Sequence, residues 1–137
     1  MRKFLITSAI VAAFSGPAFG QVELAELTVG GEVRLSTSYG WEHRADVWRL
    51  NADGTLSGVY ETSREASPRG SFYRHSGAVS GRWRLEGSRL CVEGTGFERP
   101  GRNCYSMSKG SHSEREFAGA HEQTGQIWHM FIYPRAR

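Results

Sequence analysis

Long hydrophobic runs are scarce in this chain of 137 residues. The longest, from Phe4 to Phe14, covers about 11 residues, whereas a helix that crosses a membrane needs about 20. Arg2 and Lys3 precede this run and small residues follow it. The order predicts a cleavable signal peptide over residues 1–20 and one exported domain over residues 21–137, with no membrane insertion after cleavage.

Cysteine is also scarce, because Cys91 and Cys104 are the only two. Both lie in the exported part, where an oxidising compartment favours their pairing. The disulfide would close a loop of about 14 residues and contribute roughly 3 kcal/mol. No cysteine follows the signal peptide directly, so we expect a free periplasmic or secreted protein and not a lipoprotein.

A strong excess of one charge is missing from the exported part. Without Arg2 and Lys3, 15 of the 17 basic residues remain against 14 acidic ones, a net charge of +1. The basic residues are scattered, whereas a nucleic-acid-binding face would cluster them, so we expect no nucleic-acid partner. Short catalytic, phosphate-binding and dinucleotide motifs are lacking too, which implies no cofactor and favours a protein that is not an enzyme.

Helical spacing occurs only near the start, where Val22, Leu24 and Leu27 predict one or two helical turns ended by Gly30-Gly31. From Glu32 onward the period is two, which is typical of strands with one buried face and one exposed face. The pattern therefore predicts an all-β domain after a short helical turn.

Two hairpins can be aligned from their turns. Ala52-Asp53-Gly54 suits a three-residue loop, which pairs Trp48 with Gly58 and Leu50 with Leu56 on one face. Gly87-Ser88 suits a type II′ turn between two further strands. In that hairpin Trp83 and Leu85 face Val92 and Leu90 in the core, and Cys91 points outward with Cys104 on the next strand.

The last two strands are expected at Glu114 to Ala118 and Gln126 to Tyr133. The second of these is apolar on both faces, which predicts a central or closing strand with His129 as a hydrogen-bonded core residue. Between Thr62 and Val79 the pattern is weakest: Pro68-Arg69-Gly70 predicts a turn and Ser71 to His75 an extra strand. About eight short strands predict a small antiparallel up-and-down barrel.

The segment from Trp48 to Tyr105 resembles a poorly characterised group of small exported proteobacterial proteins. The shared features are the Asp53-Gly54-Thr55 turn, a Gly-x-Trp strand at Gly81, and Leu90-Cys91 followed by a second cysteine. The resemblance implies a lipocalin-like shape and says little about function. This shape is also similar to that of bacterial periplasmic protease inhibitors.

Candidate site residues fall into two groups. Trp41, with His43 and Arg44, lies in a polar turn between strands, where an exposed aromatic side chain can contact a ligand or partner. An equal alternative is that Trp41 folds over an open end of the barrel. His112, Glu114 and His121, together with Glu116, offer imidazole and carboxylate groups that could ligate zinc. A solvated strand edge explains the second group equally well.

The first hypothesis is an exported, non-enzymatic barrel that binds an envelope protein through its loops, as an inhibitor or adaptor would. It predicts a filled barrel with exposed aromatic loop residues. One alternative is a carrier of a small apolar ligand, which requires a cavity. The others are a metal-dependent hydrolase centred on His112, Glu114 and His121, and a structural envelope protein with no site.

Overall fold

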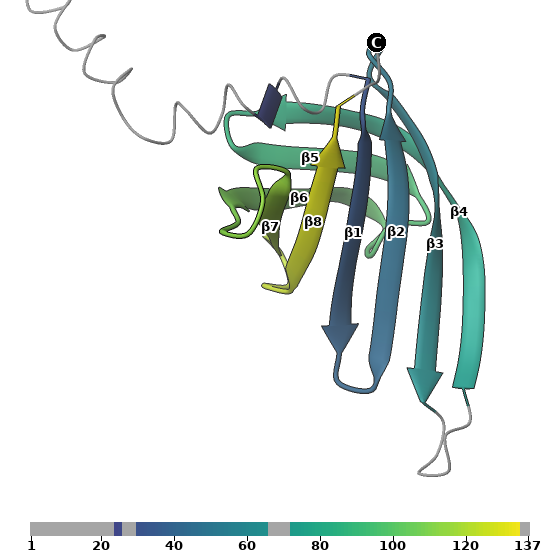
Figure 1. The fold of residues 1–137 in the computed structure, drawn as a ribbon. Helices are drawn as coiled ribbons and strands as arrows, with labels where there is room; N and C mark the ends of the chain where they lie inside the picture. Colours follow the sequence, from purple (N-terminus) through teal and green to yellow (C-terminus); the bar gives the residue numbers. More distant parts are fainter. Residues whose placement is uncertain (1–23, 26–29, 66–71, 135–137) are drawn as a thin grey trace, which may run out of the picture.

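The computed structural model describes residues 24–25, 30–65 and 72–134 of the chain. Eight antiparallel strands follow one another and form a closed barrel, in which each strand pairs with its sequence neighbours and β8 pairs with β1 (Figure 1). The strands are β1 (Glu32–Tyr39), β2 (Glu42–Leu50), β3 (Thr55–Glu65), β4 (Phe72–Glu86), β5 (Arg89–Thr95), β6 (Gly101–Lys109), β7 (Glu116–His121) and β8 (Ile127–Tyr133). The predicted eight-stranded up-and-down barrel is therefore confirmed.

The β2–β3 hairpin has the predicted register. Trp48 pairs with Gly58 and Leu50 with Leu56, and the turn glycine Gly54 has a φ of 91°. A side chain at Gly58 would place its Cβ 2.0 Å from the carbonyl oxygen of Val47, so only glycine fits at this position. The close approach leaves Trp48 space in the core, where it is 1% exposed.

The β4–β5 hairpin also follows the prediction. Leu85 pairs with Leu90 and Trp83 with Val92. Gly87 has a φ of 66° while no non-glycine residue among those described has a positive φ, which agrees with a type II′ turn. The register puts Cys91 on the outer face, where it pairs directly with Cys104 of β6.

Two predictions about strand boundaries need correction. The segment Ser71 to His75 is not a separate strand, because residues from Phe72 belong to the 15-residue strand β4. The predicted strand from Glu114 begins only at Glu116, and Glu114 lies in the preceding turn. The predicted turn at Pro68-Arg69-Gly70 lies outside the described residues.

Strand β8 closes the barrel, as predicted, but it is not buried on both faces. Its burial alternates: Trp128, Met130 and Ile132 are buried, whereas Ile127 is 58% exposed. The His129 side chain lies on the outer face and is 51% exposed, so its assignment to the core was wrong. In an antiparallel barrel the period of two dominates, even where the outward residues are themselves apolar.

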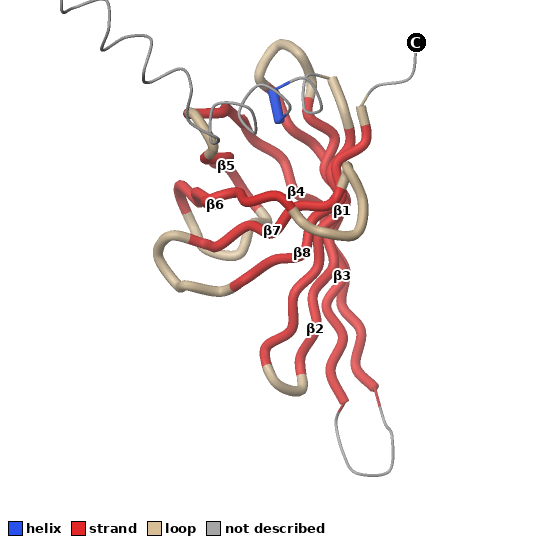
Figure 2. The backbone as a smooth tube through the Cα atoms, turned by 60° about the vertical axis from the view of Figure 1, so that its left-hand side comes forward, coloured by secondary structure: helices blue, strands red, loops and turns tan. Residues whose placement is uncertain are grey.

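Strands β1 to β4 extend beyond the barrel at one end (Figures 1 and 2). Strand β1 pairs with β8 only as far as Ser36, and β4 pairs with β5 only from Ser80 onward. We call the four strand ends beyond these points the projecting sheet: residues 37–45, 59–65 and 72–79. Its turn between β1 and β2 carries Trp41.

Apolar side chains from every strand meet inside the barrel. Leu24 adds to this core from the N-terminal side; it and Ala25 are the described part of the predicted helical turn, and both have helical backbone. The predicted signal peptide at residues 1–20 lies outside the described residues. No helix in the described segments is long and apolar enough to cross a membrane.

Candidate functional site

The projecting end of the barrel holds an ion pair inside its mouth. Arg44 donates to both carboxylate oxygens of Asp46, at 2.8 and 2.9 Å, and to the carbonyl oxygen of Gly96 at 2.5 Å. The Asp46 side chain is 0% exposed and that of Arg44 12%. Asp46 also accepts a hydrogen bond from Trp48 Nε1, and the Arg44 guanidinium lies 4.4 Å from the Tyr60 ring centre.

Burial alone would lower the pKa of Arg44, but the hydrogen bond and the charge of Asp46 outweigh this effect and raise it. Arg44 is therefore a permanently charged residue whose charge is already paired. The structure thus places this predicted binding residue in a structural ion pair, with only part of its side chain at the surface.

Glu98 closes the same mouth from the loop between β5 and β6. It accepts hydrogen bonds from the Tyr39 hydroxyl at 2.7 Å and from Trp128 Nε1 at 2.9 Å. Burial, together with the hydrogen bond to Glu98, raises the pKa of Tyr39 well above its usual range. The neighbouring Phe97 packs its ring edge against Trp48, with 5.5 Å between ring centres. The loop therefore seals the interior with both an apolar and a charged side chain.

His121 is buried in this network and not available to a ligand. Its Nδ1 accepts hydrogen bonds from the backbone N–H groups of Gln123 and Thr124, so its proton is on Nε2, which donates to Asn103 Oδ1 at 2.8 Å. Asn103 in turn donates to the carbonyl oxygen of Arg99 at 2.9 Å. The pair joins the loop after β7 to the loop before β6, which is a structural role.

The barrel interior is filled. The largest core side chains, Trp48, Trp128 and Tyr105, are each 0–1% exposed, and the buried leucine, valine and isoleucine residues around them are 0–2% exposed. A cavity able to hold a ligand would leave its lining side chains accessible to a water-sized sphere. The described core therefore contains no room for a small apolar ligand.

The other two predicted binding residues lie at the surface of the projecting sheet. Trp41 follows Gly40, whose φ is 62°, and is 72% exposed, the highest value among the described large hydrophobic residues. His43 points to the outer face, with its Nδ1 2.7 Å from the Ser38 hydroxyl. His43 and Arg44 both line an open hollow of about 420 Å³ beside this turn.

The predicted metal ligands do not assemble. His121 is inside the barrel, whereas the His112 side chain is 85% exposed and Glu114 lies in a surface turn. Among the described residues, no three His, Cys, Asp or Glu side chains form a group that could hold a metal ion. The centre that the hydrolase hypothesis requires is therefore absent from this part of the chain.

Sequence reasoning missed the partner of Glu116. This carboxylate lies 2.5 Å from His129 Nε2 and accepts a hydrogen bond from the backbone N–H of His112. The hydrogen bond from His129, followed by that from His112, lowers the pKa of Glu116. Residues 116 and 131 are paired across β7 and β8, so the contact could have been found only once the register was known.

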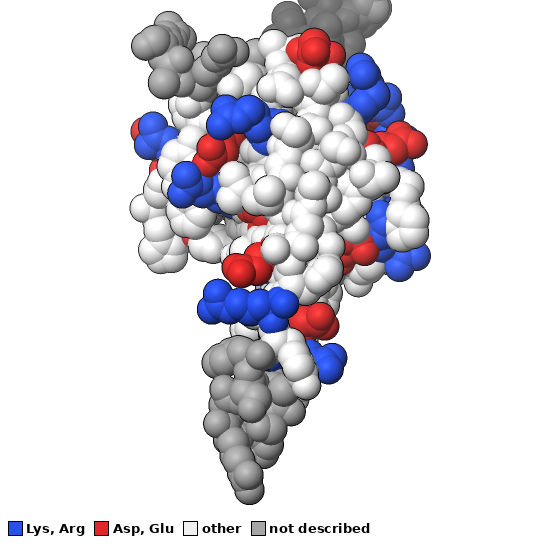
Figure 3. Space-filling view, turned by 90° about the vertical axis from the view of Figure 1, so that its right-hand side faces the viewer, with Lys and Arg blue, Asp and Glu red and all other residues white. Residues whose placement is uncertain are grey.

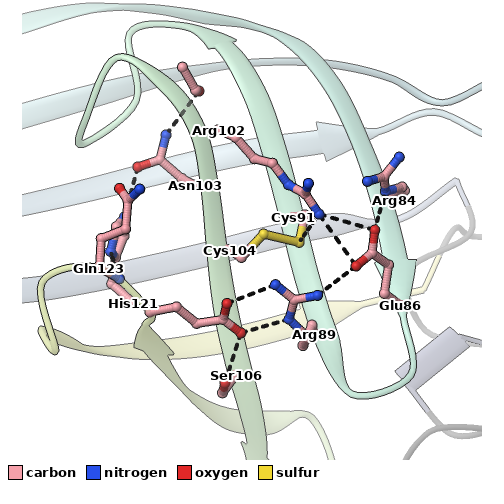
Figure 4. The surroundings of a disulfide bond; sticks show 12 residues. Arg84, Glu86, Arg89, Cys91, Arg102, Asn103, Cys104, Ser106, His121 and Gln123 are labelled. Carbon is pink, nitrogen blue, oxygen red and sulfur yellow. Dashed lines mark hydrogen bonds and ion pairs between the residues drawn. A yellow bond between two sulfur atoms is a disulfide. The ribbon is translucent and has the colours of Figure 1, made fainter.

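The disulfide Cys91–Cys104 joins β5 to β6, as predicted, and lies beneath an ionic network on the outer face (Figure 4). Arg89 binds Glu122 through two hydrogen bonds of 2.7 and 2.8 Å and also contacts Glu86. Arg84 and Arg102 contact Glu86 from the other side. A disulfide of this kind indicates a non-reducing compartment.

No protein-family model matches the sequence, and a search of curated proteins returned no significant match. The class that can be stated is therefore that of the fold: a small closed antiparallel β-barrel with one disulfide, a filled interior and a projecting four-stranded sheet.

Proposed function

We propose that this protein is an exported, non-enzymatic barrel that binds a protein partner of the cell envelope through the tip of its projecting sheet. The partner contacts Trp41 and the adjoining hollow beside His43 and Arg44. Binding there would suit an inhibitor or an adaptor. The signal peptide predicted over residues 1–20 and the disulfide support a periplasmic or secreted location.

The observation that carries this proposal is the contrast between the interior and the tip. Core side chains have almost no accessible surface, yet a tryptophan at the end of a projecting hairpin is 72% exposed. Exposed tryptophans on rigid scaffolds are frequent anchors of protein interfaces, because they bury a large area with little loss of conformational freedom. The filled core supports a protein partner over a carried apolar ligand.

The test is affinity capture from envelope extract with the mature protein, residues 21–137, in three forms. Trp41→Ala removes the proposed anchor. Tyr133→Ala is the matched control, because Tyr133 is also an exposed large hydrophobic residue, at 37%, and pairs with Glu32 at the end of β1 away from the turn. Bound proteins and small molecules are both identified by mass spectrometry.

The proposal expects one protein captured in stoichiometric amount by the wild type and by Tyr133→Ala. The loss of an interface anchor costs about 2 kcal/mol or more, so Trp41→Ala should weaken binding roughly thirtyfold. Equal capture by all three forms would contradict the proposed surface. A stoichiometric small molecule without a protein would favour the carrier hypothesis instead.

A further inference from the structure

The closed barrel leaves one long stretch of sheet edge open. Strand β4 pairs with β3 along residues Phe72 to Arg82, but it pairs with β5 only along residues Ser80 to Glu86. In the described parts of the chain, no strand pairs with the other side of residues 72–79. Because those residues belong to the projecting sheet, this edge stands clear of most of the barrel (Figure 2).

The direction of the backbone groups on this edge follows from their neighbours. The carbonyl of His75 points towards β3, since it accepts a hydrogen bond from a threonine hydroxyl there. The carbonyl of Ala78 points the other way, because a Cβ on Gly96, in the loop after β5, would lie 2.3 Å from it. Alternation along the strand then directs the N–H and C=O groups of Arg74 and Ser76 to the open side.

This edge lacks the features that usually prevent strand addition. Residues 72–79 contain neither proline nor lysine, and their register with β3 is continuous, without a bulge. Their one charged residue, Arg74, is 3.6 Å from Glu61 on β3. From the side on which β3 and β4 lie, an uncharged region covers the middle of the molecule, and charged side chains of both signs lie around it and across the narrower projecting end (Figure 3).

We propose that two copies of this chain pair through the open edges of β4. The two strands run antiparallel about a two-fold axis at His75, which joins the two projecting sheets into one. A symmetric pair uses the same surface on both copies, so the edge must be complementary to itself.

Among axes at residues 74, 75 and 76, the middle of the open edge, one register suits such a pairing best. An axis at Arg74 would set two guanidinium groups opposite each other, and like charges directly opposite are destabilising. An axis at Ser76 would set Ala78 opposite Arg74 and require the Ala78 carbonyl in the pairing, although the loop at Gly96 already approaches this carbonyl.

An axis at His75 avoids both problems. It sets Arg74 opposite Ser76, so their outward backbone groups can exchange two hydrogen bonds on each side of the axis. It also sets Tyr73, which is 64% exposed, opposite Gly77, a large residue against a small one. The dimer would carry two Trp41 tips on one particle and so bind a repeated partner surface with higher avidity.

The first test is the mass in solution of residues 21–137, measured by sedimentation over a range of concentrations. Ser76→Pro removes an N–H that β3 does not use, and proline is tolerated at a sheet edge, so the fold should persist. Ser76→Ala, the control, keeps that N–H. We expect a dimer for the wild type and Ser76→Ala, and a monomer with an unchanged circular dichroism spectrum for Ser76→Pro. A monomeric wild type, or a dimeric Ser76→Pro, would overturn the proposal.

The second test reads the register through disulfide cross-linking under mild oxidation. Residues opposite each other without hydrogen bonds have Cα atoms about 4.5 Å apart, within the range of a disulfide. His75→Cys should therefore give a covalent dimer on a non-reducing gel, while Arg74→Cys and Ser76→Cys should give little. Stronger cross-linking at position 74 or 76 than at 75 would refute the proposed axis.

Discussion

Removal of the Asp46 carboxylate should strongly destabilise the barrel. Asp→Ala at this position leaves the Arg44 guanidinium, whose side chain is 12% exposed, with only the Gly96 carbonyl as a hydrogen-bond acceptor. It also leaves Trp48 Nε1 without its acceptor in a core position. Breaking a buried ion pair by removing one partner costs about 3–5 kcal/mol.

For a domain of this size, about 4 °C of melting temperature is lost per kcal/mol, so Asp46→Ala should melt roughly 12–20 °C lower than the wild type. The measurement is thermal and urea unfolding at neutral pH with the disulfide intact. Arg44→Leu combined with Asp46→Leu should cost less than the single change, because no charge is then left unpaired.

The control is Glu61→Ala, which breaks the ion pair with Arg74. That pair has side-chain exposures of 53% and 73% and a distance of 3.6 Å, so its loss should cost less than about 1 kcal/mol. If Asp46→Ala costs no more than Glu61→Ala, the ion pair in the barrel mouth does not hold the interior closed and this reasoning is refuted.

Three further predictions follow from the fold. Gly58→Ala forces a Cβ against the Val47 carbonyl and should cost about 1–3 kcal/mol or more in urea unfolding; a neutral result would contradict the close contact at Gly58. Replacing Cys91 and Cys104 together by alanine should cost about 3 kcal/mol in the same assay, and an unchanged midpoint would contradict a stabilising bridge. His129 and His112 hold the pKa of Glu116 below 4.5, so this carboxylate stabilises the fold above pH 4.5 and ceases to do so as pH falls through its lowered pKa. The melting-temperature difference between wild type and Glu116→Gln should therefore shrink from pH 7 to pH 3, and a constant difference would argue against the assigned contact.

The hairpin registers could be predicted because local rules fixed them. Gly54 and Gly87 determine their turns, and each turn sets the pairing of every residue that follows. The inward position of Trp48 therefore followed from the sequence, and so did the outward position of Cys91.

The buried polar network was harder to predict. The same period of two that places Trp48 inward also places Arg44 and Asp46 inward, and that signal was present in the sequence. Asn103 carries the same signal, because it shares the inward face of β6 with Tyr105. Glu98 gave none, because a loop of turn composition folds back into the mouth and its path depends on partners distant in sequence. A sequence pattern predicts charged residues on the surface. Only the complete barrel supplies the hydrogen-bond and ion-pair partners that allow these residues to be buried.

The open edge of β4 could not be foreseen either. Residues 66–71 separate β3 and β4. The alternation of apolar and polar residues is weak on both sides of this segment, so it does not predict that β3 and β4 extend beyond their neighbouring strands. An edge is a property of unequal strand lengths, which depend on where β5 ends and not on the sequence of β4 alone.

The central claim, a protein partner held at the tip of the projecting sheet, is tested most directly by photo-cross-linking in the cell that produces the protein. A photoreactive amino acid replaces Trp41 in one variant and Tyr133, at the opposite end of the barrel, in another. The account predicts one discrete cross-linked protein from position 41 and none from position 133. No product at 41, or the same product at both positions, would contradict it.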